Sequence, residues 1–419
     1  MAQPTFQSLK GMHDLMPPES ARWLELVRRF GEQFARAGYA YVQTPVLEEL
    51  AVFARVGEGT DVVTKEMYDF DDRDGTRIAL RPESTAGVAR AFIQHRPPAP
   101  WKVWYSSQHF RHENTQAGRY RQHHQLGAEC FGSDHPDIDV ELIVGLWDFY
   151  ATSLGLQRIT LQLNSIGDPA ARGRFQEVLR GYFRDRVDEL HPTDREKIDR
   201  NPMRVLDSKF AESAAVVAEA PRLADQLSDA DAARHEAVQR GLAEAGVPFE
   251  LNPRLVRGLD YYTHTVFEIV SDAMDAAQST IGGGGRYDGL VESLGGPPTP
   301  GFGFGTGIER VLLACDAEEL LPLPRFAIDA FVVTFDRDED AARRLCLELR
   351  RAGVGVDRAL NQHNPRKQAD RARRAGARFI VRLGKDDLPD GTVEVVDEAD
   401  DSRFTVDRAT LAEELRSRR

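Results

Sequence analysis

The chain has 419 residues and a formal net charge of −13 at pH 7, which predicts two or three domains and argues against a broadly basic nucleic-acid-binding protein. Hydrophobic residues make up 41% of the chain, enough for sizeable cores, but no apolar run approaches the roughly 20 residues that a membrane-spanning helix needs. The three cysteines lie far apart and the first ten residues lack a signal-peptide pattern, so we expect a cytoplasmic protein with no disulfides and no membrane partner.

The first predicted elements are a helix and a strand. Between Pro18 and Gly38, apolar residues recur at helical spacing, and glycine is a natural C-terminal stop for a helix. A strand is expected over residues 39–46. Because Pro45 lies within it, that strand should lie at an edge or contain a bend.

A second helix and a long hairpin follow. Residues 80–96 are predicted to be a strand end and then a helix, capped at its start by Ser84 or Thr85. Residues 101–110 and 122–131 are predicted to be two strands, joined by a polar loop that contains glycine.

The middle of the chain is predicted to change from helix to strand. A helix is expected over residues 139–150, and the composition and periodicity of residues 166–249 indicate a mostly helical insertion. Residues 252–270 return to strand, and residues 281–289 are rich in glycine. Residues 301–313 are predicted to be a strand followed by a helix.

The proline-containing segment 321–325 is the predicted domain boundary. Beyond it, strands and helices alternate, which predicts a small α/β domain. The expected strands cover residues 330–335, 354–357, 378–383 and 392–396, and the expected helices cover residues 340–352, 365–376 and a final stretch from Asp407. Residues 361–385 carry eight Lys or Arg against one acid, a local basic footprint suited to phosphates. A solvated charged helix is the alternative.

The segment from Arg119 to Gly132 is unusually polar for a strand between apolar flanks. With a period of two, one face of the strand carries Arg121, His123, Gln125, Gly127 and Glu129. Such a face suits a ligand that lies on the sheet, whereas the alternative is a solvated hairpin face.

A metal site is the other candidate for this segment, because several histidines lie close in sequence. His123 and His124 should point to opposite faces, however, and the spacings of zinc sites are absent. We therefore predict no metal site built from protein side chains.

Two glycine runs could bring backbone close to a ligand. Glycines alternate from Gly301 to Gly307, which should leave one strand face bare for a flat group such as adenine, and Arg310 then suits a phosphate. Gly282–Gly285 forms the other run. Neither run matches a dinucleotide fingerprint or a P-loop, and tight turns or close strand packing are the alternative.

Together these segments resemble the class II aminoacyl-tRNA synthetases. The first helix and the strand ending at Pro45 resemble motif 1, Phe110-Arg-His-Glu113 with the strand from Arg121 to Glu129 resembles motif 2, and residues 301–310 resemble motif 3. The motifs are short but occur in the family's order.

Three further segments are similar to those of histidyl-tRNA synthetases. Arg257-Gly-Leu-Asp-Tyr-Tyr262 and Gly284-Gly-Arg-Tyr-Asp-Gly289 resemble that family's two signature peptides. Arg81-Pro-Glu-Ser-Thr85 resembles its Arg-Pro-Glu-Gly-Thr segment, with Ser84 in the place of the glycine. The resemblance covers nearly the whole chain.

The resemblance implies an α+β fold, with an antiparallel sheet flanked by helices. It also implies a catalytic domain over residues 1–325, a helical insertion at about 170–250 and an anticodon-binding α/β domain over residues 326–419. The implied reaction activates L-histidine with ATP and Mg²⁺ and transfers it to tRNA(His). The implied assembly, from motif 1, is a homodimer.

The resemblance also implies roles for individual residues. The residues expected to bind histidine are Glu83, Thr85 and Gln125 at the ammonium, Glu129 and Tyr262 at the ring nitrogens, and Tyr261 and Tyr287 in the same pocket. The residues expected at ATP are Arg111 at the α-phosphate, Arg121 and Arg310 at the distal phosphates, and Glu113. Arg257 would reach both the α-phosphate and the substrate carboxylate, so Arg257 and Arg111 are the expected catalytic residues.

One alternative is a non-catalytic paralogue that regulates the first enzyme of histidine biosynthesis. Such paralogues generally lack the anticodon domain and the active-site arginines, both of which this sequence has. Another class II synthetase, for example one for proline or threonine, is a further alternative that Glu129 and Tyr262 disfavour.

Overall fold

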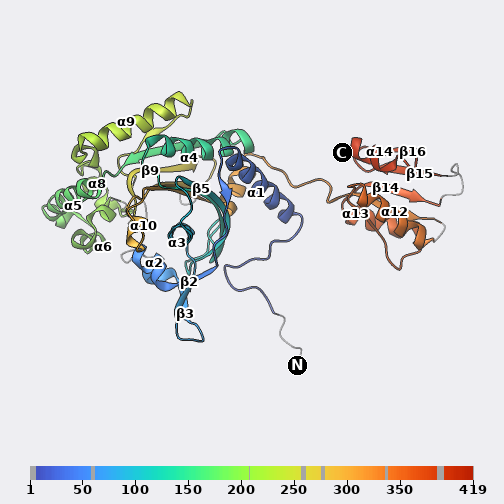
Figure 1. Ribbon diagram of the computed structural model, residues 1–419, viewed down its shortest axis with the longest axis horizontal. Helices are drawn as coiled ribbons and strands as arrows, with labels where there is room; N and C mark the ends of the chain where they lie inside the picture. Colours follow the sequence, from blue (N-terminus) through green and yellow to red (C-terminus); the bar gives the residue numbers. More distant parts are fainter. Residues whose placement is uncertain are drawn as a thin grey trace. The chain divides into compact units, whose positions relative to one another are not determined.

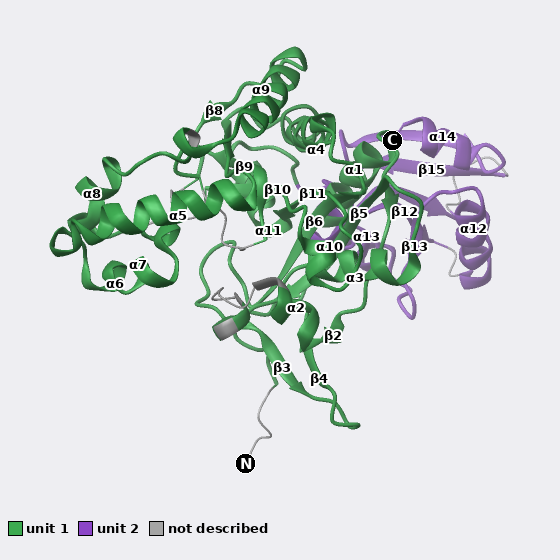
Figure 2. Ribbon diagram, turned by 60° about the vertical axis from the view of Figure 1, so that its left-hand side comes forward, with its two compact units in different colours: residues 1–15, 23–322 green, residues 16–22, 323–419 purple. Residues whose placement is uncertain are grey.

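A computed structural model describes residues 6–57, 62–206, 208–255, 261–274, 279–335, 338–384 and 391–418. The chain divides into two compact units, one formed by residues 1–15 and 23–322 and the other by residues 16–22 and 323–419 (Figure 2). Each unit contains its own sheet and its own buried apolar clusters. Within the described residues, no helix is long and apolar enough to cross a membrane.

The first unit is built on an eight-stranded sheet with the order β1-β5-β6-β11-β10-β9-β7-β8. Its strands are β1 Ala40–Tyr41, β5 Trp101–Phe110, β6 Gln122–Phe131, β7 Ile159–Ser165, β8 Glu250–Leu251, β9 Thr263–Ser271, β10 Thr280–Arg286 and β11 Gly301–Gly307. Neighbouring strands are antiparallel except at the two edges, where β1 pairs with β5 and β8 with β7 in parallel. The predicted antiparallel sheet is therefore confirmed.

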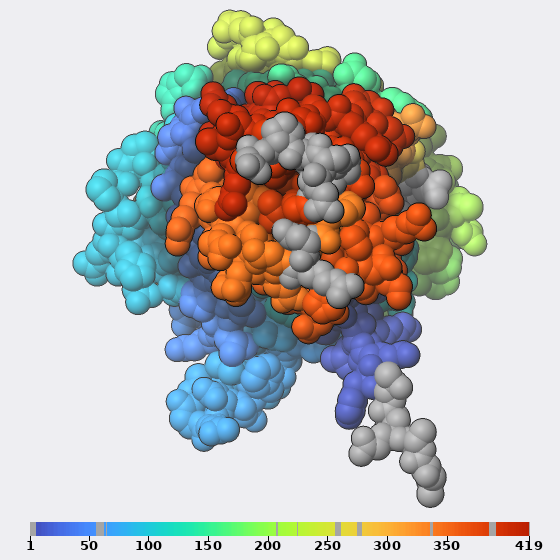
Figure 3. Space-filling view, turned by 90° about the vertical axis from the view of Figure 1, so that its right-hand side faces the viewer, coloured from blue at the N-terminus to red at the C-terminus, as the bar shows by residue number. Residues whose placement is uncertain are grey.

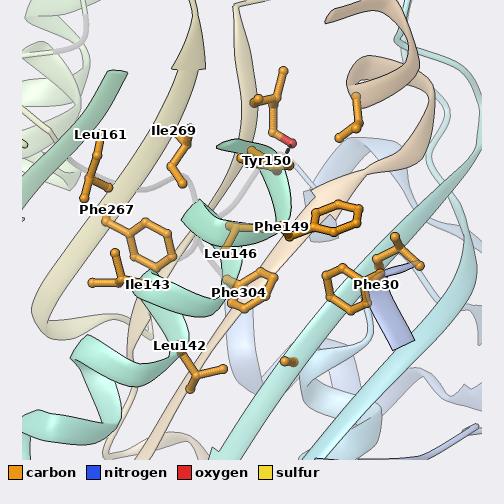
Figure 4. Packing of buried hydrophobic residues seen from close by; sticks show 14 of the residues in the cluster. Phe30, Leu142, Ile143, Leu146, Phe149, Tyr150, Leu161, Phe267, Ile269 and Phe304 are labelled. Carbon is orange, nitrogen blue, oxygen red and sulfur yellow. Dashed lines mark hydrogen bonds between the residues drawn. The ribbon is translucent and has the colours of Figure 1, made fainter. Parts of the chain in front are cut away.

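Helices flank both faces of this sheet (Figure 1). They are α1 Glu19–Arg36, α2 Leu50–Gly57, α3 Thr85–His95, α4 Pro136–Asp148, α10 Leu290–Ser293 and α11 Ile308–Ala317. On one face, α1 and α4 pack on the sheet, with Phe30, Leu146, Phe267 and Phe304 in one cluster (Figure 4). On the other face, α3 and α10 pack in a second cluster. Since alternate residues of each strand serve the two faces, the first face is apolar core and the second is free to hold polar groups.

The strand expected over residues 39–46 is mostly wrong. Only Ala40–Tyr41 joins the large sheet, and Leu47–Glu49 (β2) belongs to a separate three-stranded sheet with β4 Arg77–Leu80 and β3 Tyr68–Asp71. The chain leaves the first sheet here because Pro45 has no N–H to donate, and the Arg81 guanidinium takes the Thr44 carbonyl at 2.9 Å. The β3–β4 hairpin projects from the unit, light blue in Figure 3.

Residues 166–249 are mostly helical. The helices are α5 Pro169–Arg184, α6 Pro192–Arg195, α7 Lys197–Arg200, α8 Ala214–Ala218 and α9 Asp229–Glu244. The apolar face of α5, with Phe175, Leu179 and Phe183, belongs to the same cluster as α3 and α10. The helix α5 therefore shares the packing of the polar side of the sheet, whereas α9, with Val238 and Leu242, belongs to the apolar cluster of α1 and α4.

The second unit has a five-stranded sheet with the order β13-β12-β14-β15-β16. Its elements are β12 Ile328–Thr334, α12 Glu339–Arg351, β13 Val356–Arg358, α13 Pro365–Arg374, β14 Ala377–Leu383, β15 Thr392–Asp397, β16 Ser402–Asp407 and α14 Leu411–Ser417. The final helix was expected to begin at Asp407, but Asp407 is the last residue of β16 and the helix begins at Leu411. With only Phe404 and Val406 as inward apolar residues, β16 has too short an alternation to be recognised in the sequence.

Candidate active site

The register of the central strands brings the polar face of β6 against the glycines of β11. Glu129 lies opposite Gly303, and Gln125 lies opposite Gly307. The intervening residues of β6, such as Leu126 and Ala128, point into the apolar core on the other face. The predicted period-two arrangement of this strand is therefore confirmed.

The glycines of β11 leave a bare surface only toward the end of the strand, where Gly305 and Gly307 line a polar cavity and a Cβ atom at Gly307 would have no neighbour within 4 Å among the described residues. Elsewhere on the strand, side chains occupy the space that the glycines leave. A Cβ atom at Gly303 would lie 1.6 Å from Glu129 Oε2, and one at Gly305 would lie 3.1 Å from Gln125 Oε1. On β6, a Cβ at Gly127 would lie 2.3 Å from the Tyr105 hydroxyl. The glycines make room for neighbouring side chains that lie flat on the sheet.

Glu129 is the centre of a buried polar cluster. Its side chain has 0% exposure, and its carboxyl group accepts hydrogen bonds from Thr85 Oγ1 at 2.8 Å, from the Tyr105 hydroxyl at 3.2 Å and from the Tyr287 hydroxyl. Burial raises the pKa of Glu129 to about 8, against the lowering effect of the hydroxyl donors. Around neutral pH this carboxyl group therefore carries a proton in most molecules.

The start of α3 supplies the next part of the site. Glu83 accepts from the backbone N–H of Thr85 at 2.6 Å and of Ala86 at 2.8 Å, so Glu83 caps the helix. The predicted cap by Ser84 or Thr85 was wrong, because Ser84 makes no side-chain cap hydrogen bond and Thr85 is the first helical residue. Burial raises the pKa of Glu83.

Tyr261 and Tyr262 form an aromatic group with Tyr287, whose hydroxyl donates to Glu129. The rings of Tyr261 and Tyr262 are 4.8 Å apart, and those of Tyr261 and Tyr287 are 5.7 Å apart, edge to face. Burial raises the pKa of Tyr261 and of Tyr287 well above the usual value. Both hydroxyls stay neutral and can donate hydrogen bonds. Arg257, predicted to be catalytic, lies outside the described residues.

A polar cavity of about 710 Å³ lies beside this cluster. Five arginines line it, namely Arg111, Arg119, Arg172, Arg204 and Arg310. Arg310 Nη1 donates to the Thr280 carbonyl at 2.9 Å, and Glu113 pairs with Arg119 at 3.2 Å. Burial lowers the pKa of the Arg310 guanidinium, and an arginine side chain is a permanent cation at neutral pH.

Most of the predicted site residues lie either in the cavity wall or in the adjoining cluster, but Arg121 does not. Arg111, Glu113, Gln125, Tyr262 and Arg310 line the cavity. Glu83, Thr85, Glu129, Tyr261 and Tyr287 form the adjoining buried cluster. Arg121 is not a lining residue, and its Nε donates to the Glu113 carbonyl at 3.4 Å.

Several lining residues were not predicted. His123 does line the cavity, on the polar face predicted for β6, and burial lowers the pKa of His123 to about 3, so its ring is neutral. Tyr105, for which no role was predicted, belongs to the adjoining cluster, where it donates to Glu129. The helical insertion also contributes Arg172, Gln176, Lys197, Asn201 and Arg204. No sequence signal could have found these, because only the packing of the insertion brings them to the cavity.

Comparison with known proteins identifies the family. A family model described as histidyl-tRNA synthetase matches residues 11–311, and one described as anticodon binding domain matches residues 329–418.

The chain belongs to the histidyl-tRNA synthetase family.

A histidine–tRNA ligase of Parasynechococcus marenigrum is 42% identical to it, over 98% of this chain and 99% of its own length. A histidine–tRNA ligase of Streptomyces coelicolor is also 42% identical, over 99% of this chain and 98% of its own. Among solved structures, an apo S. aureus histidyl-tRNA synthetase matches with a TM-score of 0.81 and 33% identity, covering 98% of this chain and 100% of that chain. These matches confirm both the predicted class II fold and the predicted histidyl-tRNA synthetase family.

Proposed function

We propose that the chain is a histidine–tRNA ligase. It activates L-histidine with ATP to histidyl-adenylate and transfers the histidyl group to the 3′ end of tRNA(His), releasing pyrophosphate and then AMP. The observation that carries this proposal is family membership over both units, with a buried polar cluster beside a cavity lined by arginines.

Histidine would bind at the Glu129 cluster. Its imidazole has one ring nitrogen that donates and one that accepts, and a carboxyl group together with the Tyr262 hydroxyl can match both. Glu83, Thr85 and Gln125 would hold the ammonium group, with Tyr261 and Tyr287 enclosing the pocket. A pocket built from buried polar pairs rejects analogues that leave those groups unpaired far better than an apolar pocket does.

ATP would bind in the cavity lined by arginines. The substrate carboxylate attacks the α-phosphorus in line, and negative charge develops on the phosphoryl oxygens. Arg111 and Arg310 would stabilise this charge electrostatically, Arg257 would reach both reacting groups, and Arg121 would act on the distal phosphates after a movement of its side chain. No protein nucleophile is required.

Mg²⁺ would accompany ATP. It prefers oxygen ligands and commonly binds through one or two carboxylates together with phosphates and water. The carboxylates of Glu113 and Glu268 both line the cavity, which fits that preference. Bound there, the ion would neutralise charge on the phosphates.

The C-terminal unit would bind tRNA. Four cationic side chains of α13 are exposed and have no ion pair within the described part of the chain, namely Arg366, Lys367, Arg371 and Arg374. Other arginines of the basic stretch are engaged, since Arg378 pairs with Asp397 at 3.2 Å. The proposed phosphate-contacting surface is therefore the exposed face of α13. We further propose a cytoplasmic homodimer, on the resemblance of α1 to motif 1.

The regulatory alternative has less support. The chain matches the anticodon binding domain over residues 329–418, and its full-length relatives at about 42% identity are named as ligases.

Histidine-dependent exchange of pyrophosphate into ATP tests the proposal. We expect exchange with histidine and none with other amino acids. Arg111→Ala should reduce this exchange by about 100-fold or more, because it removes a fixed charge from the phosphates. The matched control is Arg77→Ala, which removes an arginine from the projecting β3–β4 hairpin, where it pairs with Asp71 at 3.2 Å. Absence of exchange in the wild type, or equal exchange with several amino acids, would refute the assignment.

A further inference from the structure

The segment that leads into α3 is tied residue by residue to the end of β5. Arg81 Nε donates to the Gln108 carbonyl at 2.8 Å, and the Phe110 N–H donates to the Arg81 carbonyl at 3.0 Å. Arg111 Nε donates to the Pro82 carbonyl at 2.9 Å. In all three hydrogen bonds the acceptor is a backbone carbonyl, and in two of them the donor is an arginine side chain.

A fourth tie is made by two side chains. Ser84 Oγ and His109 Nε2 are hydrogen-bonded at 2.8 Å. Ser84 is 2% exposed and His109 is 0% exposed. A glycine in place of Ser84 would have no side chain with which to make this bond.

The Ser84 hydroxyl does not cap α3, although serine often has that role at a helix N-terminus. Serine before the first turn of a helix commonly accepts a backbone N–H there, whereas here the Glu83 carboxylate accepts both N–H groups. The three consecutive side chains are thus tied in three directions. Glu83 bonds the helix, Ser84 bonds β5, and Thr85 bonds Glu129 on β6.

The ring of His109 depends on this bond. Its Nδ1 atom is buried and has no hydrogen-bond partner within the described residues, so Ser84 supplies the hydrogen bond that the ring has there. Burial also lowers the pKa of His109 well below its usual value, which keeps the ring neutral. A neutral hydrogen bond with no access to water fixes the geometry of both partners, because neither can exchange its partner for solvent.

We propose that Ser84 and His109 are a pair of positioning residues that hold Glu83 and Thr85 in register with Arg111. The inference rests on the proposed function, in which Glu83 and Thr85 bind the ammonium group of histidine and Arg111 binds the α-phosphate. His109 precedes Arg111 by two residues at the end of β5, and Ser84 lies between Glu83 and Thr85. The pair therefore joins the half of the site that holds the amino acid to the half that holds the nucleotide.

The first test removes the Ser84 side chain and with it the hydrogen bond to His109. Ser84→Gly should raise the KM for histidine in pyrophosphate exchange by about tenfold, the effect of losing one buried hydrogen bond. The rate of transfer from preformed histidyl-adenylate to tRNA should stay within about twofold, because that step no longer needs the two substrates to be aligned. A merely structural role would instead lower the active fraction and affect both steps equally.

The second test asks whether the two residues act through each other. His109→Ala should raise the same KM, and the double variant should be no worse than His109→Ala alone. His109→Gln should recover most of the loss, because its amide can reach the Ser84 hydroxyl. If His109→Ala does not fold, Ser84→Gly and His109→Gln still decide the question. Ser271→Ala is the matched control, since Ser271 is also fully buried but lies at the end of β9.

Two outcomes would overturn the proposal while leaving the ligase assignment intact. One is a wild-type KM for histidine in Ser84→Gly, and the other is additive effects of the two substitutions in the double variant. A wild-type protein without any histidine-dependent exchange would instead overturn the assignment, and the positioning role with it.

Discussion

Replacing Glu129 by glutamine should change how stability depends on pH. The carboxyl group of Glu129 is fully buried, and its pKa is raised to about 8, against about 4.3 in an unfolded chain. Glutamine keeps the size and the acceptor oxygen of the side chain, and its amide can donate to the Tyr287 hydroxyl. The substitution therefore removes the titrating proton with little change in shape.

The sign follows from where the proton resides. Between about pH 4.3 and pH 8, the folded protein keeps the Glu129 proton and the unfolded chain has lost it, so the free energy of unfolding falls as pH rises. The slope reaches about 1.4 kcal/mol per pH unit. Between about pH 6 and pH 8 the wild type should lose about 2 kcal/mol from this group, and above about pH 9 the loss should level off. Glutamine has no such dependence.

The measurement is denaturant unfolding of both proteins across this pH range, followed by near-ultraviolet circular dichroism. The difference in free energy of unfolding should shift toward the glutamine variant by about 2 kcal/mol between about pH 6 and pH 8. Glu292→Gln, an exposed carboxylate on α10, is the control and should show no shift. A pH-independent difference for Glu129→Gln would refute the conclusion that the fold keeps this carboxyl group protonated. The same variant should also lose histidine-dependent exchange.

Two further predictions concern the glycine face and α13. Gly303→Ala should reduce histidine-dependent exchange by about 100-fold or more, because the added carbon would lie 1.6 Å from Glu129 Oε2 and must displace a group that binds substrate. Gly181→Ala, with no atom within 4 Å of its added carbon, should keep full exchange, and equal activity of the two variants would contradict the reasoning. Replacing both Arg371 and Arg374 by alanine should leave histidine-dependent exchange unchanged and raise the KM for tRNA in aminoacylation. The slope of log KM for tRNA against log[salt] should fall by about 1–2. An unchanged slope would exclude α13 from the tRNA surface.

The sequence predicted the parts of the fold whose signals are local. The bounds of β5 and β6 were predicted residue for residue, because each strand has a strong alternation and ends at a proline or a polar loop. The three-stranded sheet was missed, since β2 and β3 are only three and four residues long. Short strands hold their place by pairing, which the sequence does not display.

The site was predictable to the extent that one strand carries it. Period-two alternation on β6 correctly placed Gln125 and Glu129 on one face, and the family resemblance supplied their partners. The cap of α3 was predicted wrongly because propensity favours serine there, whereas tertiary contact with His109 takes the serine hydroxyl away and leaves the helix to Glu83. The basic residues that the insertion contributes to the cavity, Arg172, Lys197 and Arg204, are brought there by packing between distant segments, which has no local signature in the sequence.

The strand order of the large sheet has a consequence for synthesis on the ribosome. β6 ends at Phe131, but its second neighbour, β11, begins only at Gly301, so about 170 residues must be added first, which takes on the order of 10 s. During that interval the β5–β6 hairpin exposes an unpaired edge, a template for wrong pairing with other chains. The yield of active protein in a cell should therefore depend on how the nascent chain is protected while the helical insertion emerges, a property that equilibrium stability does not measure.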